Sequence, residues 1–73
     1  MVNIESQFTI KNKINILRTE KQMTQQALAD AVAVTRATIN AMERGAYNPS
    51  LELAFRLARF FEVDIQEIFS VED

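Results

Sequence analysis

The sequence predicts an all-α fold, a single domain of five short helices, and three observations support this. Apolar residues recur at spacings of three and four through most of the chain, which is the period of an amphipathic helix. Residues that cap helices stand before several of these runs. A chain of 73 residues forms one domain, which buries only about 60% of its unfolded surface. The predicted helices span about 10–21, 25–32, 36–44, 51–61 and 65–69.

At the N-terminus the period changes to two. Apolar and polar residues alternate between Val2 and Ile10, broken only at Ser6, and this alternation indicates a strand. Because a lone strand is unstable, we expect residues near 2–8 to pair with residues near 68–72, within one subunit or across a dimer. The alternative is a frayed chain end.

The first helix is predicted from Ile10, Ile14 and Leu17, which lie at i, i+4 and i+7 and face inward together. The second and third helices each follow a threonine, Thr24 and Thr35, whose hydroxyl can accept an N–H of the first turn. The apolar faces of these two helices can close on each other only at a steep angle. One apolar face consists of Leu28, Ala29 and Val32. The other consists of Val34, Ile39 and Met42.

This geometry leaves the third helix with a free polar side, which suits the major groove of DNA. Gly45 stands where a helix C-terminus takes a left-handed residue. Pro49 and Ser50 predict a turn and an N-cap before the fourth helix, and Asp64 with Glu67 has the spacing of a capping box. The inner stripe of the fourth helix is Leu53, Ala54, Leu57, Ala58 and Phe61.

Charge is unevenly distributed, although its sum is only −2. Between residues 9 and 44, six Lys or Arg oppose three Asp or Glu, whereas five acidic residues and no basic one follow from Glu62 onward. The positive half suits a nucleic acid, and we expect the acidic end to point away from it. Chance scatter over a solvated surface is the alternative. Arg56 and Arg59 are expected to be solvated or paired with Glu52 or Glu62.

The composition argues against several classes of function. The chain has no cysteine and no histidine, which removes disulfides, the commonest metal ligands and the usual general base. The carboxylates are dispersed, so no catalytic residue is identified and an enzyme is not expected. We expect no metal and no cofactor, and no small-molecule effector is identifiable. No apolar run approaches the roughly 20 residues of a membrane span, and no leader is recognised, so a cytoplasmic location without membrane contact is expected.

In their order and spacing, five segments resemble a helix-turn-helix regulator of the Cro/phage-repressor type, the XRE family. They are an LxxxK-type first helix around Leu17 to Lys21 and the runs MTQQALA, TRATINAMERG, YNPSLELAFRLARFF and VDIQEIF. The resemblance extends from Lys11 to Phe69. It implies a phage-repressor-like domain whose third helix enters the major groove of double-stranded DNA.

The resemblance also implies roles for single residues. Gln25 would bind a phosphate, Arg18 would pair with Glu43 near the DNA backbone, and Arg36 would make the leading base contact. The guanidinium of Arg36 can bind guanine O6 and N7 together, which is worth roughly 1–3 kcal/mol of discrimination. The alternatives are an ordinary helix-start glutamine for Gln25 and a sequence-blind phosphate clamp for Arg36. The predicted DNA-binding residues are Arg18, Gln25, Thr35, Arg36, Ala37, Thr38, Asn40, Arg44, Tyr47 and Asn48.

Within this set, Ala37 can touch a thymine methyl group, and Asn40 can bind adenine N6 and N7 if it faces the groove. Ala41 falls where some relatives have a polar base reader, which indicates a short or degenerate half-site. Tyr47 lies in the loop that family members place on phosphates, with packing as the alternative.

Two positions depart from the family's pattern. The tight turn usually carries glycine but here has Ala33, and left-handed alanine costs roughly 1–2 kcal/mol. Either this turn is strained or its backbone has moved. Glu62 stands where relatives often have glycine, which leaves the end of the fourth helix open.

The predicted function is sequence-specific transcription regulation, by a repressor that binds a palindromic operator as a homodimer, because one domain recognises too few base pairs alone. A protein-interaction module, such as an antitoxin or accessory subunit, is the alternative, supported by a pI near 5.0. The expected dimer interface uses apolar residues that otherwise fill the monomer core: Ile65, Ile68, Phe69 and Val71.

Overall fold

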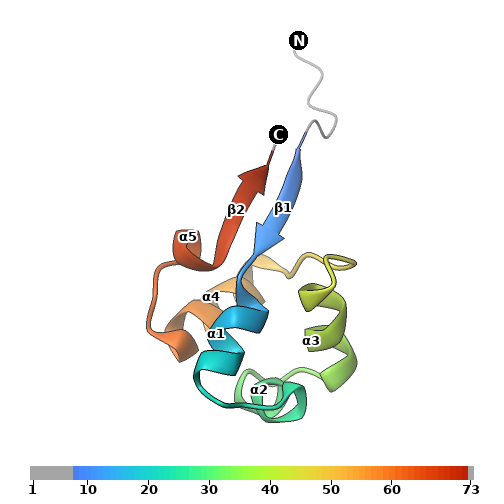
Figure 1. Ribbon diagram of the computed structural model, residues 1–73, viewed down its shortest axis with the longest axis vertical. Helices are drawn as coiled ribbons and strands as arrows, with labels where there is room; N and C mark the ends of the chain where they lie inside the picture. Colours follow the sequence, from blue (N-terminus) through green and yellow to red (C-terminus); the bar gives the residue numbers. More distant parts are fainter. Residues whose placement is uncertain (1–7, 73) are drawn as a thin grey trace.

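The computed structural model describes residues 8–72. A compact group of helices carries a two-stranded sheet that projects from one end (Figure 1). The predicted five-helix fold with a terminal strand pair is confirmed. The elements are β1 (Thr9–Asn12), α1 (Ile14–Glu20), α2 (Gln25–Ala31), α3 (Arg36–Glu43), α4 (Leu51–Phe61), α5 (Ile65–Ile68) and β2 (Phe69–Glu72).

Side-chain caps fix where the later helices begin. The hydroxyl groups of Thr24, Thr35 and Ser50 each accept a backbone N–H from the first turn of α2, α3 and α4. At α5 the Asp64 N–H donates to Glu67 Oε2 at 2.7 Å, one half of the capping box. These four helices begin where the sequence predicts, and α2, α3 and α5 each end one residue earlier than predicted.

The prediction that the first helix begins at residue 10 is wrong. Residues 9–12 form β1, and α1 begins only at Ile14. Asn12 marks the change, because its Nδ2 donates to the carbonyl of Met42 at 2.9 Å and its Oδ1 accepts the Ile14 N–H at 3.1 Å. Ile10, expected to face inward from a helix, is therefore a strand residue and only partly buried.

The predicted terminal pairing exists, but with a different first strand. β1 runs antiparallel to β2, with Ile10 opposite Val71 and Asn12 opposite Phe69. The expected partner region 68–72 is thus confirmed, whereas the N-terminal partner is 9–12. Residues 2–7 of that expectation lie outside the described residues.

The core lies where α1 to α5 meet, and Figure 1 shows α1 crossing in front of α4. The stripes predicted for the second, third and fourth helices are buried, except that Val34 is only partly buried beside the core. Among the described residues, no polar or charged residue is classed as buried. The buried cluster comprises Ile14, Leu28, Ala29, Val32, Ile39, Met42, Leu53, Leu57, Ala58, Phe61 and Ile68.

Several residues adopt the left-handed backbone conformation. Gly45 has a φ of +75°, as predicted after α3. Ala33 has a φ of +61°, so the turn between α2 and α3 keeps the glycine conformation and carries the strain of a side chain there. Glu62, with a φ of +58°, ends α4 at Phe61 as predicted, which answers the question its sequence position raised.

Arg56 is neither solvated nor paired with a glutamate, contrary to expectation. Its Nη1 donates to the carbonyl of Val32 at 2.8 Å, at the C-terminal end of α2. The partial negative charge at a helix C-terminus favours such a cation. Its Nε is buried without a partner among the described residues. Arg56 therefore ties α4 to the helix that precedes the strained turn.

The strained turn gives a stability prediction. Ala33→Gly removes a left-handed alanine, worth about 1–2 kcal/mol, but loosens the unfolded chain by about 0.4–1 kcal/mol. We expect the free energy of unfolding to rise by about 1 kcal/mol, measured by urea denaturation.

The matched control is Gly45→Ala. A Cβ at Gly45 would meet no heavy atom within 4 Å, so the same two terms act with opposite sign and the free energy of unfolding should fall by about 1 kcal/mol. An unchanged midpoint for Ala33→Gly would contradict the strained turn.

Candidate nucleic-acid interface

Helix α3 is held by its back and open at its front. Ile39 and Met42 are fully buried, whereas Arg36 and Ala37 in the first turn are exposed. Figure 1 shows α3 at one side of the helical group, with no other described element over its outer side. The predicted leading base contact, Arg36, and its neighbour Ala37 are therefore presented together to solvent.

Two further residues of the predicted DNA-binding set, Thr35 and Thr38, contact each other at the start of α3. Thr35 Oγ1 accepts the Thr38 N–H at 3.2 Å and lies 3.0 Å from the Thr38 hydroxyl. These two threonines begin and stabilise α3, whatever they contact outside the protein.

The predicted pairing of Arg18 with Glu43 is confirmed. Arg18 Nε lies 2.7 Å from Glu43 Oε2, and Nη2 lies 3.2 Å from Oε1, which makes a two-pronged ion pair. The third guanidinium nitrogen, Nη1, donates to the carbonyl of Met23 at 2.7 Å. The Glu43 side chain is only 4% exposed. This pair joins α1 to the end of α3.

A hydrogen-bonded chain extends from this carboxylate across the interface. Glu43 Oε1 also accepts from Gln25 Nε2 at 3.0 Å and from Asn15 Nδ2 at 3.3 Å. Asn40 Nδ2 donates to Gln25 Oε1 at 3.4 Å, and Arg44 Nε donates to Asn40 Oδ1 at 2.8 Å. We call these residues, with Arg18, the polar chain. Sequence reasoning missed Asn15, and the only local signal was the i, i+4 spacing of Asn40 and Arg44.

The polar chain shifts the pKa values of Arg18 and Glu43. Burial by itself raises the pKa of Glu43, but hydrogen bonds from Arg18 and Gln25, the charge of Arg18 and the hydrogen bond from Asn15 outweigh it. The net pKa of Glu43 therefore lies below its ordinary value. The hydrogen bond to Glu43 raises the pKa of Arg18, against the effect of burial. The pair is ionised at neutral pH, and the carboxylate charge is locally balanced.

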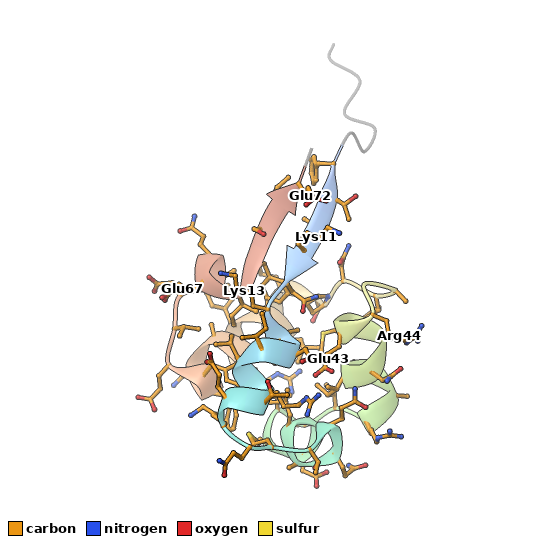
Figure 2. The ribbon with its side chains drawn as sticks, viewed as in Figure 1. Lys11, Lys13, Glu43, Arg44, Glu67 and Glu72 are labelled. Carbon is orange, nitrogen blue, oxygen red and sulfur yellow. The ribbon has the colours of Figure 1, made fainter. Side chains whose placement is uncertain are left out.

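The remaining predicted contacts lie after α3. Arg44 points away from the helical group, while Glu43 faces α1 (Figure 2). The backbone N–H groups of Gly45 and Ala46 donate to carbonyls of α3. Tyr47, which is 45% exposed, and Asn48 lie in the loop after α3, and both are accessible to solvent.

The residues predicted for the dimer interface divide into one that is buried in the monomer and three that are exposed or partly exposed. Ile68 is 2% exposed and fills the monomer core, the alternative that the sequence left open. Val71 is 58% exposed, and Ile65 and Phe69 are partly exposed. The last two line an uncharged hollow, here called the apolar groove, whose lining residues are Ile10, Asn48, Pro49, Leu51, Ala54, Ile65 and Phe69.

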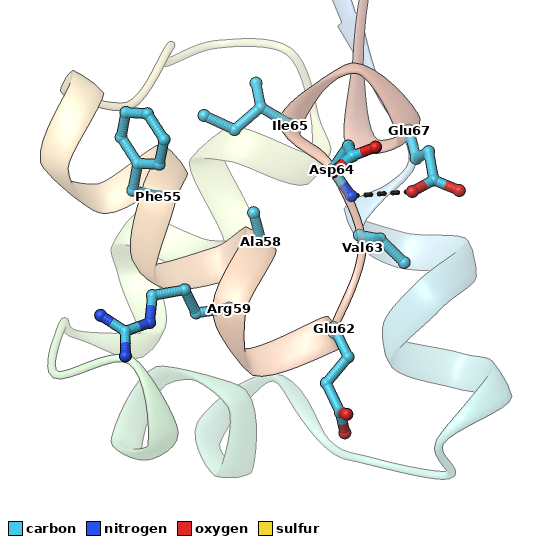
Figure 3. A pocket seen from close by; sticks show the side chains of 8 residues that line it. All are labelled: Phe55, Ala58, Arg59, Glu62, Val63, Asp64, Ile65 and Glu67. Atoms are coloured by element: carbon cyan, nitrogen blue, oxygen red, sulfur yellow. Dashed lines mark hydrogen bonds between the residues drawn. The ribbon is translucent and has the colours of Figure 1, made fainter.

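A second hollow lies between α4 and α5 (Figure 3). Its rim carries both signs of charge, from Arg59 and from Glu62, and Asp64 and Glu67 are used there to cap α5. None of its lining residues belongs to α2 or α3. We therefore assign it no part in the interface.

Residues 8–72 contain neither a membrane-spanning helix nor a cluster of metal ligands. No helix there has the length and apolar character needed to cross a membrane. In the same residues, no group of three or more His, Cys, Asp or Glu side chains is placed to hold a metal ion.

Comparison with known proteins gives concordant matches. A family model described as helix-turn-helix matches residues 14–68. An HTH-type transcriptional regulator of Methanocaldococcus jannaschii is 48% identical over 64 residues, covering 88% of this chain and 97% of the relative. The cryptic phage CTXphi transcriptional repressor RstR of Vibrio cholerae is 37% identical over 59 residues, covering 81% of this chain and 53% of the repressor.

A solved structure is similar as well. The restriction-modification controller protein C.AhdI from Aeromonas hydrophila superposes with a TM-score of 0.69 at 31% identity, covering 75% of this chain and 80% of that one.

The polar chain predicts a pH-dependent stability. Because the folded pKa of Glu43 is depressed, its contribution is complete above the unfolded pKa and is lost as the pH falls through the folded value. Glu43→Gln should lower the free energy of unfolding at pH 7 by about 1–3 kcal/mol. The gap between the two proteins should close below a pH of about 4, measured by urea denaturation across pH.

Glu20→Gln is the control, since Glu20 ends the same helix as Arg18 but is exposed. It makes the same charge change and should be almost neutral. A deficit for Glu43→Gln that persists undiminished at pH 3 would contradict the ion-pair interpretation.

Proposed function

Because the chain belongs to the helix-turn-helix family of transcriptional regulators, we propose that it is a repressor that binds a palindromic operator as a homodimer. Family membership makes it a DNA-binding regulator and not an enzyme. In the proposal, α3 of each subunit enters the major groove. Repression is supported by the name of the Vibrio cholerae relative.

The observation that carries the proposal is the exposed first turn of α3, whose opposite face is buried in the core. Arg36 presents a planar, permanently charged fork from α3, and Ile39 and Met42 anchor that helix in the core. Arg36 binds guanine O6 and N7, and the methyl group of Ala37 contacts a neighbouring thymine. Thr35 and Thr38, which are engaged with each other, approach phosphates or base edges from the same turn.

Phosphate contacts flank this turn. We assign them to Gln25 at the start of α2 and to Arg44, Tyr47 and Asn48 at the end of α3 and in the following loop. Arg18 lies behind them and balances Glu43, so the carboxylate does not repel the DNA. Of the assigned phosphate contacts, Arg44 carries a positive charge, and the phosphate that it neutralises releases counterions, which makes affinity fall with salt.

Dimerisation is supported by an apolar surface that continues from the groove onto the sheet. The register of β1 and β2 places Ile10, Phe69 and Val71 on one face. Lys11 and Glu72 form an exposed ion pair at 3.5 Å on the other face (Figure 2). Leu51, 71% exposed, borders the groove. One surface thus offers both a hollow and projecting apolar side chains, as a two-fold interface requires.

The proposal is tested first by base preference. Duplexes selected from a random library should share a two-part site with guanine at one position of each half. Arg36→Ala should remove that preference, a loss of about 1–3 kcal/mol against the other bases, measured by titration of single-base variants.

Arg59→Ala, an exposed arginine of α4 outside α2 and α3, is the charge-matched control and should leave the preference intact. If Arg36→Ala weakens every duplex equally, Arg36 is a phosphate clamp. If the wild-type protein binds only weakly and without dependence on salt, the protein-interaction alternative, which the pI near 5.0 supports, replaces the regulator.

Subunit association is tested separately. Val71→Asp places a charge on the exposed apolar face of β2, where pairing would bury it without a partner, so the variant should sediment as a monomer at concentrations where the wild type is a dimer. At concentrations where both proteins are monomers, their melting temperatures should differ little, because Val71 is exposed.

The control is Ile16→Ser, which removes an exposed apolar side chain from α1, outside the apolar groove, and should leave association unchanged. A wild-type protein that sediments as a monomer at every concentration tested would refute the homodimer.

A further inference from the structure

We propose that Asn40 is a positioning residue that fixes α3 against α2, and that base recognition is confined to the first turn of α3. This inference rests on the proposed function and is an alternative to the interpretation that Asn40 binds adenine if it faces the groove. It also predicts which positions of the operator are specified.

An asparagine that recognises adenine uses both atoms of its amide, one to accept from N6 and one to donate to N7. Both atoms of Asn40 are engaged inside the protein. Its Oδ1 accepts from Arg44 Nε at 2.8 Å, and its Nδ2 donates to Gln25 Oε1 at 3.4 Å. Asn40 is also only partly exposed, unlike Arg36 one turn earlier. Each atom can make one more hydrogen bond, but the two internal bonds fix the orientation of the amide. Contact with adenine in any other orientation would break them.

The ends of the polar chain dictate how the amides are oriented. Glu43 can only accept, so Gln25 must turn its Nε2 toward it, at 3.0 Å. Gln25 Oε1 is then left to accept from Asn40 Nδ2. Arg44 can only donate, so Asn40 must turn its Oδ1 toward it. Each amide has one orientation that satisfies both neighbours, and the four side chains form a continuous series of donors and acceptors.

This series spans the two helices that the resemblance pairs in DNA binding. Gln25 is the first residue of α2, and Asn40 lies in the middle of α3. The hydrogen bond between Gln25 and Asn40 sets the angle at which α3 projects. The Arg18–Glu43 ion pair anchors the C-terminal end of α3. A change at Asn40 therefore alters how well α3 fits any groove, independent of sequence.

The base-recognising set is small as a result. Arg36 and Ala37 are exposed and make no hydrogen bond through their side chains in the described structure. The hydroxyl group of Thr38 already lies 3.0 Å from that of Thr35. Each half-site should hence contain one strongly specified guanine and little beyond it, with discrimination recovered by requiring two half-sites at a fixed spacing.

The test is a base-substitution profile of the selected operator for the wild type, Asn40→Ala and Arg36→Ala. Asn40→Ala should weaken binding about threefold to tenfold, the effect of one or two hydrogen bonds, by the same factor at every operator variant. Its profile of preferences should match the wild type. Loss of preference at a single adenine position would overturn the inference and establish Asn40 as a base reader.

Gln26→Ala is the matched control, since Gln26 is the exposed neighbour of Gln25 and, within residues 8–72, its amide donates only to Asp30, at 2.9 Å. It should change affinity by less than about twofold. An equal loss for Gln26→Ala and Asn40→Ala would contradict the special position of Asn40.

A second measurement needs no DNA. The unfolding constants of Gln25→Ala, Asn40→Ala and the double variant should be non-additive by about twofold or more, as for residues in one hydrogen-bonded network. Additive effects would contradict the role of the Gln25–Asn40 hydrogen bond in fixing α3 against α2. A wild type that binds no duplex would refute the proposed function instead, so the two failures are distinguishable.

Discussion

The carboxylate of Glu43, whose side chain is only 4% exposed, is the constraint on which the arrangement of α1, α2 and α3 depends. Helices α1, α2 and α3 have only seven, seven and eight residues, less than the roughly 12–15 at which an isolated helix becomes stable. Their relative placement must come from contacts between them. Glu43 makes such contacts with Arg18 and Asn15 of α1 and with Gln25 of α2. One ionised group therefore fixes three helices.

The same carboxylate would be unfavourable at a surface that binds phosphates if it stood alone. Arg18 removes this problem with two hydrogen bonds and an opposite charge, and the low exposure of Glu43 limits its field in solvent. The apolar core and the polar chain thus have separate tasks. Ile39 and Met42 hold α3 in the protein, and the polar chain determines its angle.

Sequence reasoning located the helices well where local chemistry decides. The caps at Thr24, Thr35 and Ser50 act through a bond to a residue three positions later, and such bonds are visible in the sequence. Ile10 was misassigned because its spacing to Ile14 fits a helix while the preceding alternation fits a strand. Only the pairing of Ile10 with Val71, 61 positions away, decides between them, and a local period contains no information about it.

The candidate site shows the same division. The resemblance to a known family predicted the Arg18–Glu43 pair, which no periodicity indicates. It did not predict that Arg56 donates to the carbonyl of Val32 or that Asn40 donates to Gln25. The two bonds join residues that lie 24 and 15 positions apart in the sequence, so no local spacing indicates them. Side chains that the period alone assigns to an outer face can therefore make hydrogen bonds within the fold. The contacts that a polar residue of α3 can make to a base depend on how its bonds inside the protein orient it.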